Sequence, residues 1–406
     1  MNGRDETAAQ PAMATALCAT LQAVGGGLGW SVVPPLLPQI AREVGISHTM
    51  GGVVWGAAPL GIALSAPIGG AAVDRFGARR VASAAMLFGA LACAARIFAH
   101  GAWSFAAAMF AFGLHIGFVA PSIPKILAAH VPLARVGRAN GIAVTSYTLG
   151  TAIIALLART VIAPAFGGWR PTMLVAALAM ALAGIAFYAL VRDRGAVSAH
   201  ASVFDSLKLV RNGQLLRVAS MQFLLFGGYL ALLGTLPRLL SDRGLPPKQV
   251  GIAVATWLAV AAFGNYVGPS LSDSLGRRRI VITVGSVLAG AGLLAMAVLP
   301  ASLSTGCLVL SAIGGGAFAP LLLSLPLEIE GIGPQRAGAA LGVLMLVGQV
   351  GGFLLPIATG TAAHMGGMSG ALVLLGIAHF AILIPAMGLR ERNGSQAAAA
   401  VPAVAG

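Results

Sequence analysis

Residues 70–80 read GAAVDRFGARR, and residues 268–279 read GPSLSDSLGRRR. At a constant offset of 199 residues, the matched pairs are Asp74 with Asp273, Gly77 with Gly276, and Arg79 with Arg278. Chance matches of glycine are frequent in a chain with 55 glycines, so the rarer Asp and Arg pairs carry the weight. The chain therefore contains an internal duplication.

The same register extends well beyond the charged loop. It pairs Pro38 with Pro237, Gly69 with Gly268, Gly117 with Gly316, and Ala120-Pro121 with Ala319-Pro320. Parallel repeats in a membrane protein place a substrate site at their interface near the middle of the bilayer, and one half rocks against the other. We therefore expect two related halves with a site between them.

The composition places these halves in lipid. Of the 406 residues, 58% are hydrophobic and 9% are charged, which is too few charges to cover a water-soluble surface of this size. A hydrocarbon core about 30 Å thick requires about 20 apolar residues of each spanning helix. Twelve such runs occur, at 13–38, 50–73, 81–99, 102–128, 138–162, 170–191, 214–237, 249–272, 280–299, 303–327, 338–362 and 368–389.

These runs predict an all-α membrane protein whose twelve transmembrane helices form two pseudo-symmetric six-helix bundles. Lipid offers no partner for free backbone groups, and a barrel would need alternating polarity in segments of about ten residues. The predicted parts are a cytoplasmic amino-terminal tail at 1–12, two halves at 13–191 and 214–389, a cytoplasmic central loop at 192–213, and a flexible tail at 390–406.

The net charge of +14 indicates orientation in the membrane. With the amino terminus inside, the inner loops and inner helix ends hold 18 of the 25 Lys and Arg residues. Positive residues concentrate on the cytoplasmic side, so both termini are predicted to be cytoplasmic. The sequence has no basic stripe with interleaved aromatic residues, which argues against nucleic acid as a partner. The high Ala and Gly content favours a bacterial inner membrane.

The residue types of the repeated loop have physical reasons. A glycine near the helix end lets another helix pack closely, the aspartate pairs with arginine or accepts from a helix amino terminus, and the second glycine turns the chain. Both copies contain this pattern at the same helix junction, between the second and third predicted helix of each half.

The loop resembles the signature of the major facilitator superfamily, Gly-x-x-x-Asp-Arg-x-Gly-Arg-Arg, and the layout resembles that superfamily over the whole chain. Ala78, Pro269 and Ser274 depart from the pattern. The resemblance implies that the loop charges stabilise one access state; the alternative is that they only cap helices and fix topology. The predicted gating motif comprises Gly70, Asp74, Arg75, Gly77, Arg79, Asp273, Gly276 and Arg278.

Polar groups inside the spans are costly in lipid, so each is a candidate for solute binding. The candidate cavity residues are Gln22, His115, Tyr147, Gln222, Asn265 and Gln349. His115 is alternatively a neutral imidazole bonded within the helices, and the amides are alternatively interhelical contacts. Arg96 and Lys125 lie near the ends of their runs, where long basic side chains snorkel toward the interface.

The acidic residues indicate the charge of the solute. All 11 fall outside the predicted helix middles, which favours a neutral or anionic solute over a cation and leaves His115 or an end-placed carboxylate for coupling. The stretch Pro121-Ser-Ile-Pro-Lys125, with 137–141 after it, resembles cyanate- and nitrate/nitrite-type members of the superfamily. The arginine that nitrate porters carry in the second and eighth helices has no counterpart here.

The predicted function is secondary active or facilitative transport of a small polar or anionic solute by alternating access. Efflux of hydrophobic drugs or metabolites is one alternative, and a non-transporting membrane receptor is another. We expect no enzyme activity, no cofactor and no metal, because the seven His residues are scattered and the sequence has no nucleotide-binding Gly-x-x-x-x-Gly-Lys motif. The expected partners are the solute, membrane lipid and, as an open alternative, a coupling proton or ion, with the protein as a monomer.

Overall fold

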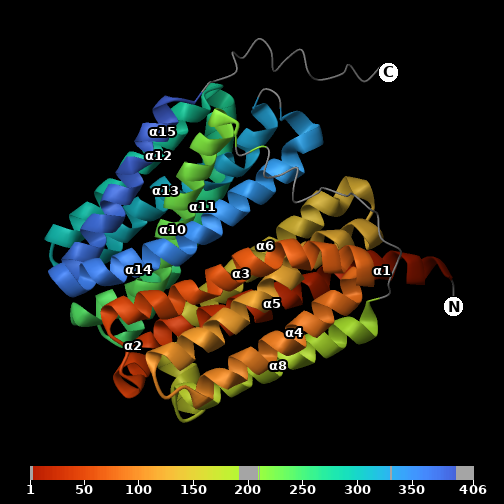
Figure 1. Cartoon of the computed structure of the whole chain (residues 1–406), viewed down its shortest axis with the longest axis horizontal. Coiled ribbons are helices and arrows are strands. Elements are labelled where there is room, and N and C mark those ends of the chain that lie inside the picture. Colours follow the sequence, from red (N-terminus) through yellow and green to blue (C-terminus); the bar gives the residue numbers. More distant parts are fainter. Residues whose placement is uncertain (1–2, 192–208, 210, 330–331, 390–406) are drawn as a thin grey trace. The chain divides into compact units, whose positions relative to one another are not determined.

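The computed structural model describes residues 3–191, 209, 211–329 and 332–389. Most of the predicted central loop at 192–213 and the whole predicted tail at 390–406 lie outside these residues. The described part is built of helices, as the apolar runs predict, because a helix satisfies its backbone groups internally. Figure 1 gives their labels and order along the chain.

The first half begins with an interrupted helix. Helix α1 spans Gly3–Leu21, a π-helical segment η1 spans Gln22–Trp30, and α2 spans Val33–Val44, so the first apolar stretch runs six residues past its predicted end. The remaining elements are α3 (His48–Phe76), α4 (Ala78–Ala95), η2 (Arg96–Phe98), α5 (Ala102–His130), α6 (Leu133–Leu157), η3 (Ala158–Ile162), α7 (Ala163–Ala165) and α8 (Trp169–Leu190).

The second half repeats the pattern of long helices. Its elements are α10 (Gly213–Asp242), α11 (Pro247–Leu275), α12 (Arg278–Val298), η4 (Ala301–Leu303), α13 (Ser304–Glu328), α14 (Gly333–Ala381) and α15 (Leu383–Met387). The Asn212 side chain caps α10 by accepting from the backbone N–H groups of Gln214, at 2.9 Å, and Leu215, at 3.1 Å.

The described residues contain 11 helices that are long and apolar enough to span a membrane, against the twelve predicted. The difference lies in one 49-residue segment, Ala339–Met387, which covers the last two predicted spans. A straight helix of that length would be roughly 74 Å long, more than twice the hydrocarbon thickness. The backbone leaves helical geometry at Gly366 and Gly367, between those two spans, so the segment can cross twice.

The chain forms two compact units that do not coincide with the predicted halves. Unit 1 holds Met1–His200, Tyr229–Leu258 and Gly352–Ala371, and unit 2 holds Ala201–Gly228, Ala259–Gly351 and Leu372–Gly406. In unit 1, α3 packs most extensively against α5, and α4 packs against α5 and α8 (Figure 1). The division into halves at 13–191 and 214–389 stays a prediction.

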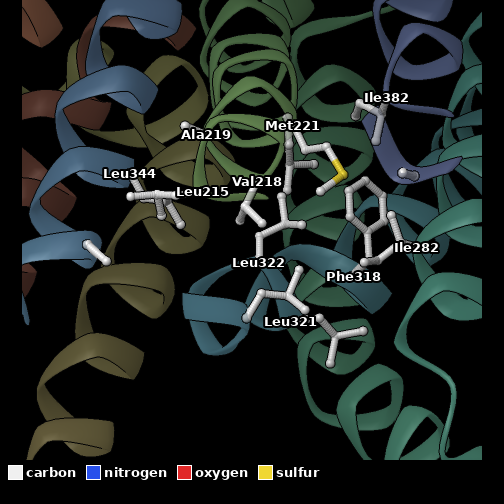
Figure 2. Packing of buried hydrophobic residues seen from close by; sticks show 14 of the residues in the cluster. Leu215, Val218, Ala219, Met221, Ile282, Phe318, Leu321, Leu322, Leu344 and Ile382 are labelled. Atoms are coloured by element: carbon white, nitrogen blue, oxygen red, sulfur yellow. The ribbon is translucent and has the colours of Figure 1, made fainter. Parts of the chain in front are cut away.

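Unit 2 has an apolar core of its own. Phe318 and Leu322 of α13 are fully buried, together with Ile282 of α12 and Met221 of α10. Figure 2 shows these side chains converging, with Ile382 beside them. Because lipid is as apolar as leucine, such interdigitation stabilises the unit through close packing rather than through removal of apolar surface from water.

Candidate functional site

The first copy of the charged loop joins α3 to α4 and contains an ion pair. Asp74, in the last turn of α3, pairs with Lys125 of α5, and the two side chains are 31% and 29% exposed. Gly77 follows with φ +86° and ψ +144°, and its N–H donates to the Val73 carbonyl at 3.0 Å. A side chain rarely adopts this backbone conformation, so the expected turning role of Gly77 has a structural reason.

Arg75 and Arg79, the two arginines of the predicted gating motif in this loop, contact other residues. Arg75 lies over the Phe76 ring, 5.2 Å from its centroid. Arg79 donates from Nε to the Tyr188 carbonyl at 2.8 Å and lies 4.3 Å from the Tyr188 ring centroid. Within the described contacts, neither arginine pairs with Asp74. Lys125, which was not predicted as a partner of the loop aspartate, comes from α5, 51 residues farther along the chain.

The second copy, between α11 and α12, contains a three-residue charge cluster. Arg278 pairs with Asp273, and its Nη2 lies 3.1 Å from Oε1 of Glu328 at the end of α13. The Nη1 group of Arg278 also donates to the Ser272 hydroxyl at 3.2 Å. Gly276 supplies the turn with φ +63°.

Close helix packing next to both loops depends on the glycine pair Gly69 and Gly268. A Cβ at Gly69 would overlap the Gly117 carbonyl of α5, and a Cβ at Gly268 would overlap the Ala317 carbonyl of α13. Gly70, which belongs to the predicted gating motif, has no atom within 4 Å of such a Cβ. The glycine that permits close helix packing is therefore Gly69, one residue before the first residue of the predicted gating motif.

His115 lies in the core of the first half rather than among the other candidates. It is 1% exposed, its Nδ1 bonds to the Phe112 carbonyl of its own helix, and its ring meets Phe112 edge-on at 4.4 Å. Gly89 of α4 leaves room for it, since a Cβ there would overlap the imidazole. The imidazole fills a gap between α4 and α5.

The segment η1 meets α6 at a group of hydroxyls. The Ser31 and Thr151 hydroxyls lie 3.0 Å apart, and the Tyr147 side chain bonds to both residues. A Cβ at Gly26 would overlap the Tyr147 ring, and a Cβ at Gly27 would lie 3.0 Å from Gly150. The glycines of η1 thus allow α6 to approach and bring these hydroxyls together.

Two aromatic pairs lie in the same unit as these hydroxyls, and their residues are not among the candidates taken from the sequence. Trp30 packs on Trp55 with ring centroids 5.6 Å apart, and Tyr229 stacks on Trp257 at 5.4 Å. Trp55 donates from Nε1 to the Leu230 carbonyl at 2.7 Å. All these residues belong to unit 1. Tryptophan spacing alone gives no sign of this convergence, because each residue comes from a different helix.

Arg96 was expected to snorkel, and the structure shows that this is wrong. Its side chain is fully buried, with Nη1 donating to the Gly29 carbonyl at 2.7 Å and the guanidinium carbon 4.1 Å from the Phe112 ring centroid. Nε and Nη2 have no hydrogen-bond partner among the described residues. The side chain turns inward because Gly29, in a segment of irregular backbone, offers a carbonyl.

The remaining candidates are dispersed. Gln222 is 6% exposed and lies against Gly348, and its carbonyl oxygen and that of Gln349 lack partners among the described residues. Both belong to unit 2. Asn265 is exposed, and Gln22 is partly buried at the start of η1. Among the candidate cavity residues, Tyr147 is the one that the structure joins to the hydroxyl group.

The predicted outer ends of helices from both halves pack tightly within unit 1. A Cβ at Gly52 of α3 would overlap a carbonyl of α14, and a Cβ at Gly251 of α11 would lie 2.9 Å from the Leu156 carbonyl of α6. Arg159 of η3 donates to the Ser241 hydroxyl of α10 at 2.7 Å. In the part of the chain that the structure describes, no three His, Cys, Asp or Glu side chains are grouped to hold a metal ion.

Comparison with known proteins agrees with this architecture. Residues 19–356 match the sequence model of the Major Facilitator Superfamily, and residues 218–404 match it a second time. The "Nitrite extrusion protein" of Bacillus subtilis (strain 168) is 27% identical over 346 residues, covering 83% of this chain and 84% of that protein. The "Probable nitrate transporter NarT" of Staphylococcus epidermidis is 25% identical over 346 residues, covering 83% and 86%.

The fold has solved counterparts as well. The crystal structure of the nucleoside transporter NupG superposes with a TM-score of 0.77 at 14% identity, covering 94% of this chain and 99% of that one. The predicted resemblance, including that to nitrate/nitrite-type members, is confirmed. From the long apolar helices, the repeated loop and the family match together, the chain is an integral membrane transporter that belongs to the Major Facilitator Superfamily.

Proposed function

We propose that the chain transports a small inorganic anion of the size and charge of nitrate or nitrite by alternating access. The observation that carries this proposal is a polar group in unit 1, where the Ser31, Thr151 and Tyr147 side chains bond to one another and the buried indole N–H of Trp30, the neighbour of Ser31 in the chain, has no partner among the described residues. Hydroxyl and N–H groups donate to an acceptor-only solute and offer no counter-charge to a cation.

The distribution of charge supports the same solute class. In the described spans, acidic side chains lie near helix ends, as Glu43, Asp74, Asp273 and Glu328 do. Arg96, by contrast, is fully buried, and its guanidinium binds the η1 backbone next to Trp30. A positive charge behind the hydroxyl region favours an anion there, because Coulomb interactions are stronger away from water. Two relatives named for nitrite and nitrate support this solute class.

The other sequence candidates receive different roles in this proposal. We assign His115 to packing between α4 and α5, and the loop charges at Asp74 and Asp273 to stabilising one access state. The amides of Gln222 and Gln349 remain candidates for solute contact in unit 2. No chemical conversion, cofactor or metal is assigned, and the protein is taken to act as a monomer.

The location in the cell is part of the proposal. Both termini and the central loop are placed in the cytoplasm of a bacterium, with the helices in the inner membrane, on the basis of the 18-to-7 bias of Lys and Arg. Reporter fusions within residues 192–213 should be active inside the cell. A reporter that is active outside contradicts this orientation.

Counterflow in proteoliposomes tests the transported solute. Vesicles that contain the purified protein and are loaded with nitrite should take up labelled nitrate faster than protein-free vesicles, and choline should not compete. Repeating the assay with and without a pH gradient separates proton-coupled transport from exchange. If neither anion moves while a hydrophobic drug or a cation does, the proposal is wrong. Transport of the drug would favour the efflux alternative.

A further inference from the structure

Two neighbouring indoles in unit 1 differ in the state of their N–H groups. Trp30 and Trp55 lie with ring centroids 5.6 Å apart and planes at 46°. Trp55 is 2% exposed and donates to the Leu230 carbonyl at 2.7 Å. Trp30 is 5% exposed, and its Nε1 has no partner among the described residues. Both indoles are thus buried, but only the N–H of Trp55 has an acceptor among the described residues.

An unpaired buried donor is unfavourable unless something occupies it. Buried indole N–H groups usually find an acceptor, and leaving one unpaired costs the desolvation of that group. Phenylalanine would pack on Trp55 without this cost. The presence of tryptophan at position 30 therefore points to an acceptor that is absent when the site is empty.

The backbone beneath Trp30 is irregular in a way that suits a binding element. Gln22–Trp30 is π-helical, and such segments are frequent at functional sites. Pro34 lacks the N–H that would reach the Gly29 carbonyl in a π-helical register. Arg96 donates to that carbonyl instead, at 2.7 Å, and so fixes the residue that precedes Trp30.

The residue after Trp30 belongs to a group of bonded hydroxyls. Ser31, its neighbour in the chain, shares a 3.0 Å contact with the Thr151 hydroxyl, and Tyr147 joins the pair. Irregular backbone at membrane depth is tolerated where it lines a cavity or a site, and broken helices bind solutes in other transporters. The Ser31 hydroxyl also donates to the Gly26 carbonyl at 3.3 Å, so the Trp30 N–H is the donor in this group that lacks an acceptor among the described residues. An N–H of this kind matches a small oxyanion, which accepts hydrogen bonds and donates none.

We propose that the indole N–H of Trp30 donates a hydrogen bond to the transported oxyanion and contributes to selecting it. This inference rests on the proposed function, because it takes nitrate or nitrite as the solute class. Recognition then uses the neutral N–H of Trp30, with Arg96 bonded to the carbonyl of the preceding residue, Gly29, and needs no arginine in direct contact with the anion.

Trp30→Phe tests the inference by removing the N–H and keeping an aromatic ring. For nitrate counterflow we expect KM to rise about tenfold with maximal rate nearly unchanged, as for loss of one hydrogen bond to a charged ligand. Nitrate should raise the Tm of the wild type and have a weaker effect on the variant. Replacing residue 30 with 3-benzothienylalanine, which keeps the shape of indole but has sulfur in place of N–H, should give the same result.

Two matched variants control for the loss of ring size. Trp55→Phe leaves the Leu230 carbonyl without its donor, so it should lower Tm more than Trp30→Phe does. Trp103 is 73% exposed, and Trp103→Phe should change neither Tm nor KM. A KM for nitrate within twofold of wild type in both residue-30 variants overturns the inference, and so does a fall in Tm as large as that of Trp55→Phe. If the wild type moves neither anion, the proposed function fails, and the Tm comparison still decides whether the Trp30 N–H is unpartnered.

Discussion

The two copies of the charged loop both turn at a glycine with positive φ, but their aspartates have different partners. In the first copy, Asp74 pairs with Lys125, which comes from α5. In the second, Asp273 pairs with Arg278 of its own loop, and Arg278 also contacts Glu328 of α13. The helix that packs against the loop contributes a cation in one half and an anion in the other.

The duplicated loops share the residues that set the backbone and the aspartate, but they do not share the residues that pair with the aspartate. At the offset of 199 residues, Lys125 matches Ser324, and Glu328 matches Ala129. The partners are therefore not shared, whereas the aspartate and the glycines are. A carboxylate at the edge of the bilayer needs a cation nearby, and the cation can come from any adjacent helix end. The ion pairs of the two loops can thus be changed independently of each other.

The largest expected effect concerns the packing that both copies share. Gly69→Ala and Gly268→Ala each place a methyl group on a carbonyl of the facing helix, so each should lower the free energy of unfolding by about 3 kcal/mol. Gly70→Ala, one residue away, meets no atom within 4 Å and should be neutral or stabilising by about 0.5 kcal/mol. Denaturant unfolding in detergent measures all three. Equal losses at Gly69 and Gly70 would contradict the assignment of the packing glycine.

The next effect separates the two turns. Gly77 has φ +86° with ψ +144°, which is outside the left-handed helical region and is essentially restricted to glycine, so Gly77→Ala should cost about 2 kcal/mol. Gly276 has φ +63° and precedes α12, where an alanine should cost about 1 kcal/mol. Thermal unfolding of the two variants, with Gly70→Ala as reference, should rank them in this order. The reverse ranking would show that the two loops do not differ as described.

Much of the fold follows from the sequence because lipid leaves few alternatives. Apolar runs of about 20 residues must be helical, and the constant offset of 199 residues predicts the repetition. Gly77 and Gly276 were expected to turn the chain, and both have positive φ. The number of spanning helices was harder to predict, because α14 is interrupted at Gly366 by a local change in backbone conformation inside an apolar segment.

The candidate site was predicted less well, for a different physical reason. Which face of an apolar helix meets its neighbours depends on packing, since a helix that is hydrophobic all round shows no preferred face in its sequence. The polarity of His115 and Tyr147 marked both as candidates, but only contacts separate them. Lys125 and Trp30 acquire their meaning from partners far away in the chain, which spacing does not reveal.

The pairing difference predicts unequal effects of removing each aspartate. Asp74→Asn leaves Lys125 without its counter-ion, and we expect a loss of about 1 kcal/mol, or roughly a fivefold change in the balance of access states and in counterflow rate. Asp273→Asn should have a smaller effect, because Arg278 keeps Glu328. Lys125→Gln added to Asp74→Asn should restore part of the rate, since it removes the unpaired cation. A normal rate for Asp74→Asn would favour a purely topological role for the loop.

The smallest expected effect comes from the residue that the first copy lacks. Glu328→Gln removes one of two carboxylates around Arg278 and leaves Asp273 as its partner. The pair is partly exposed, so the change in the free energy of unfolding should stay below about 0.5 kcal/mol and should shrink as salt is raised. The Tm of Glu328→Gln in low and high salt checks this prediction.

In an Asp273→Asn background the same substitution should cost more than in the wild type, because Arg278 then loses both carboxylates and resembles Lys125 in Asp74→Asn. Additive losses would mean that the second cluster is not one network, and the contrast between the copies would then rest on Lys125 alone.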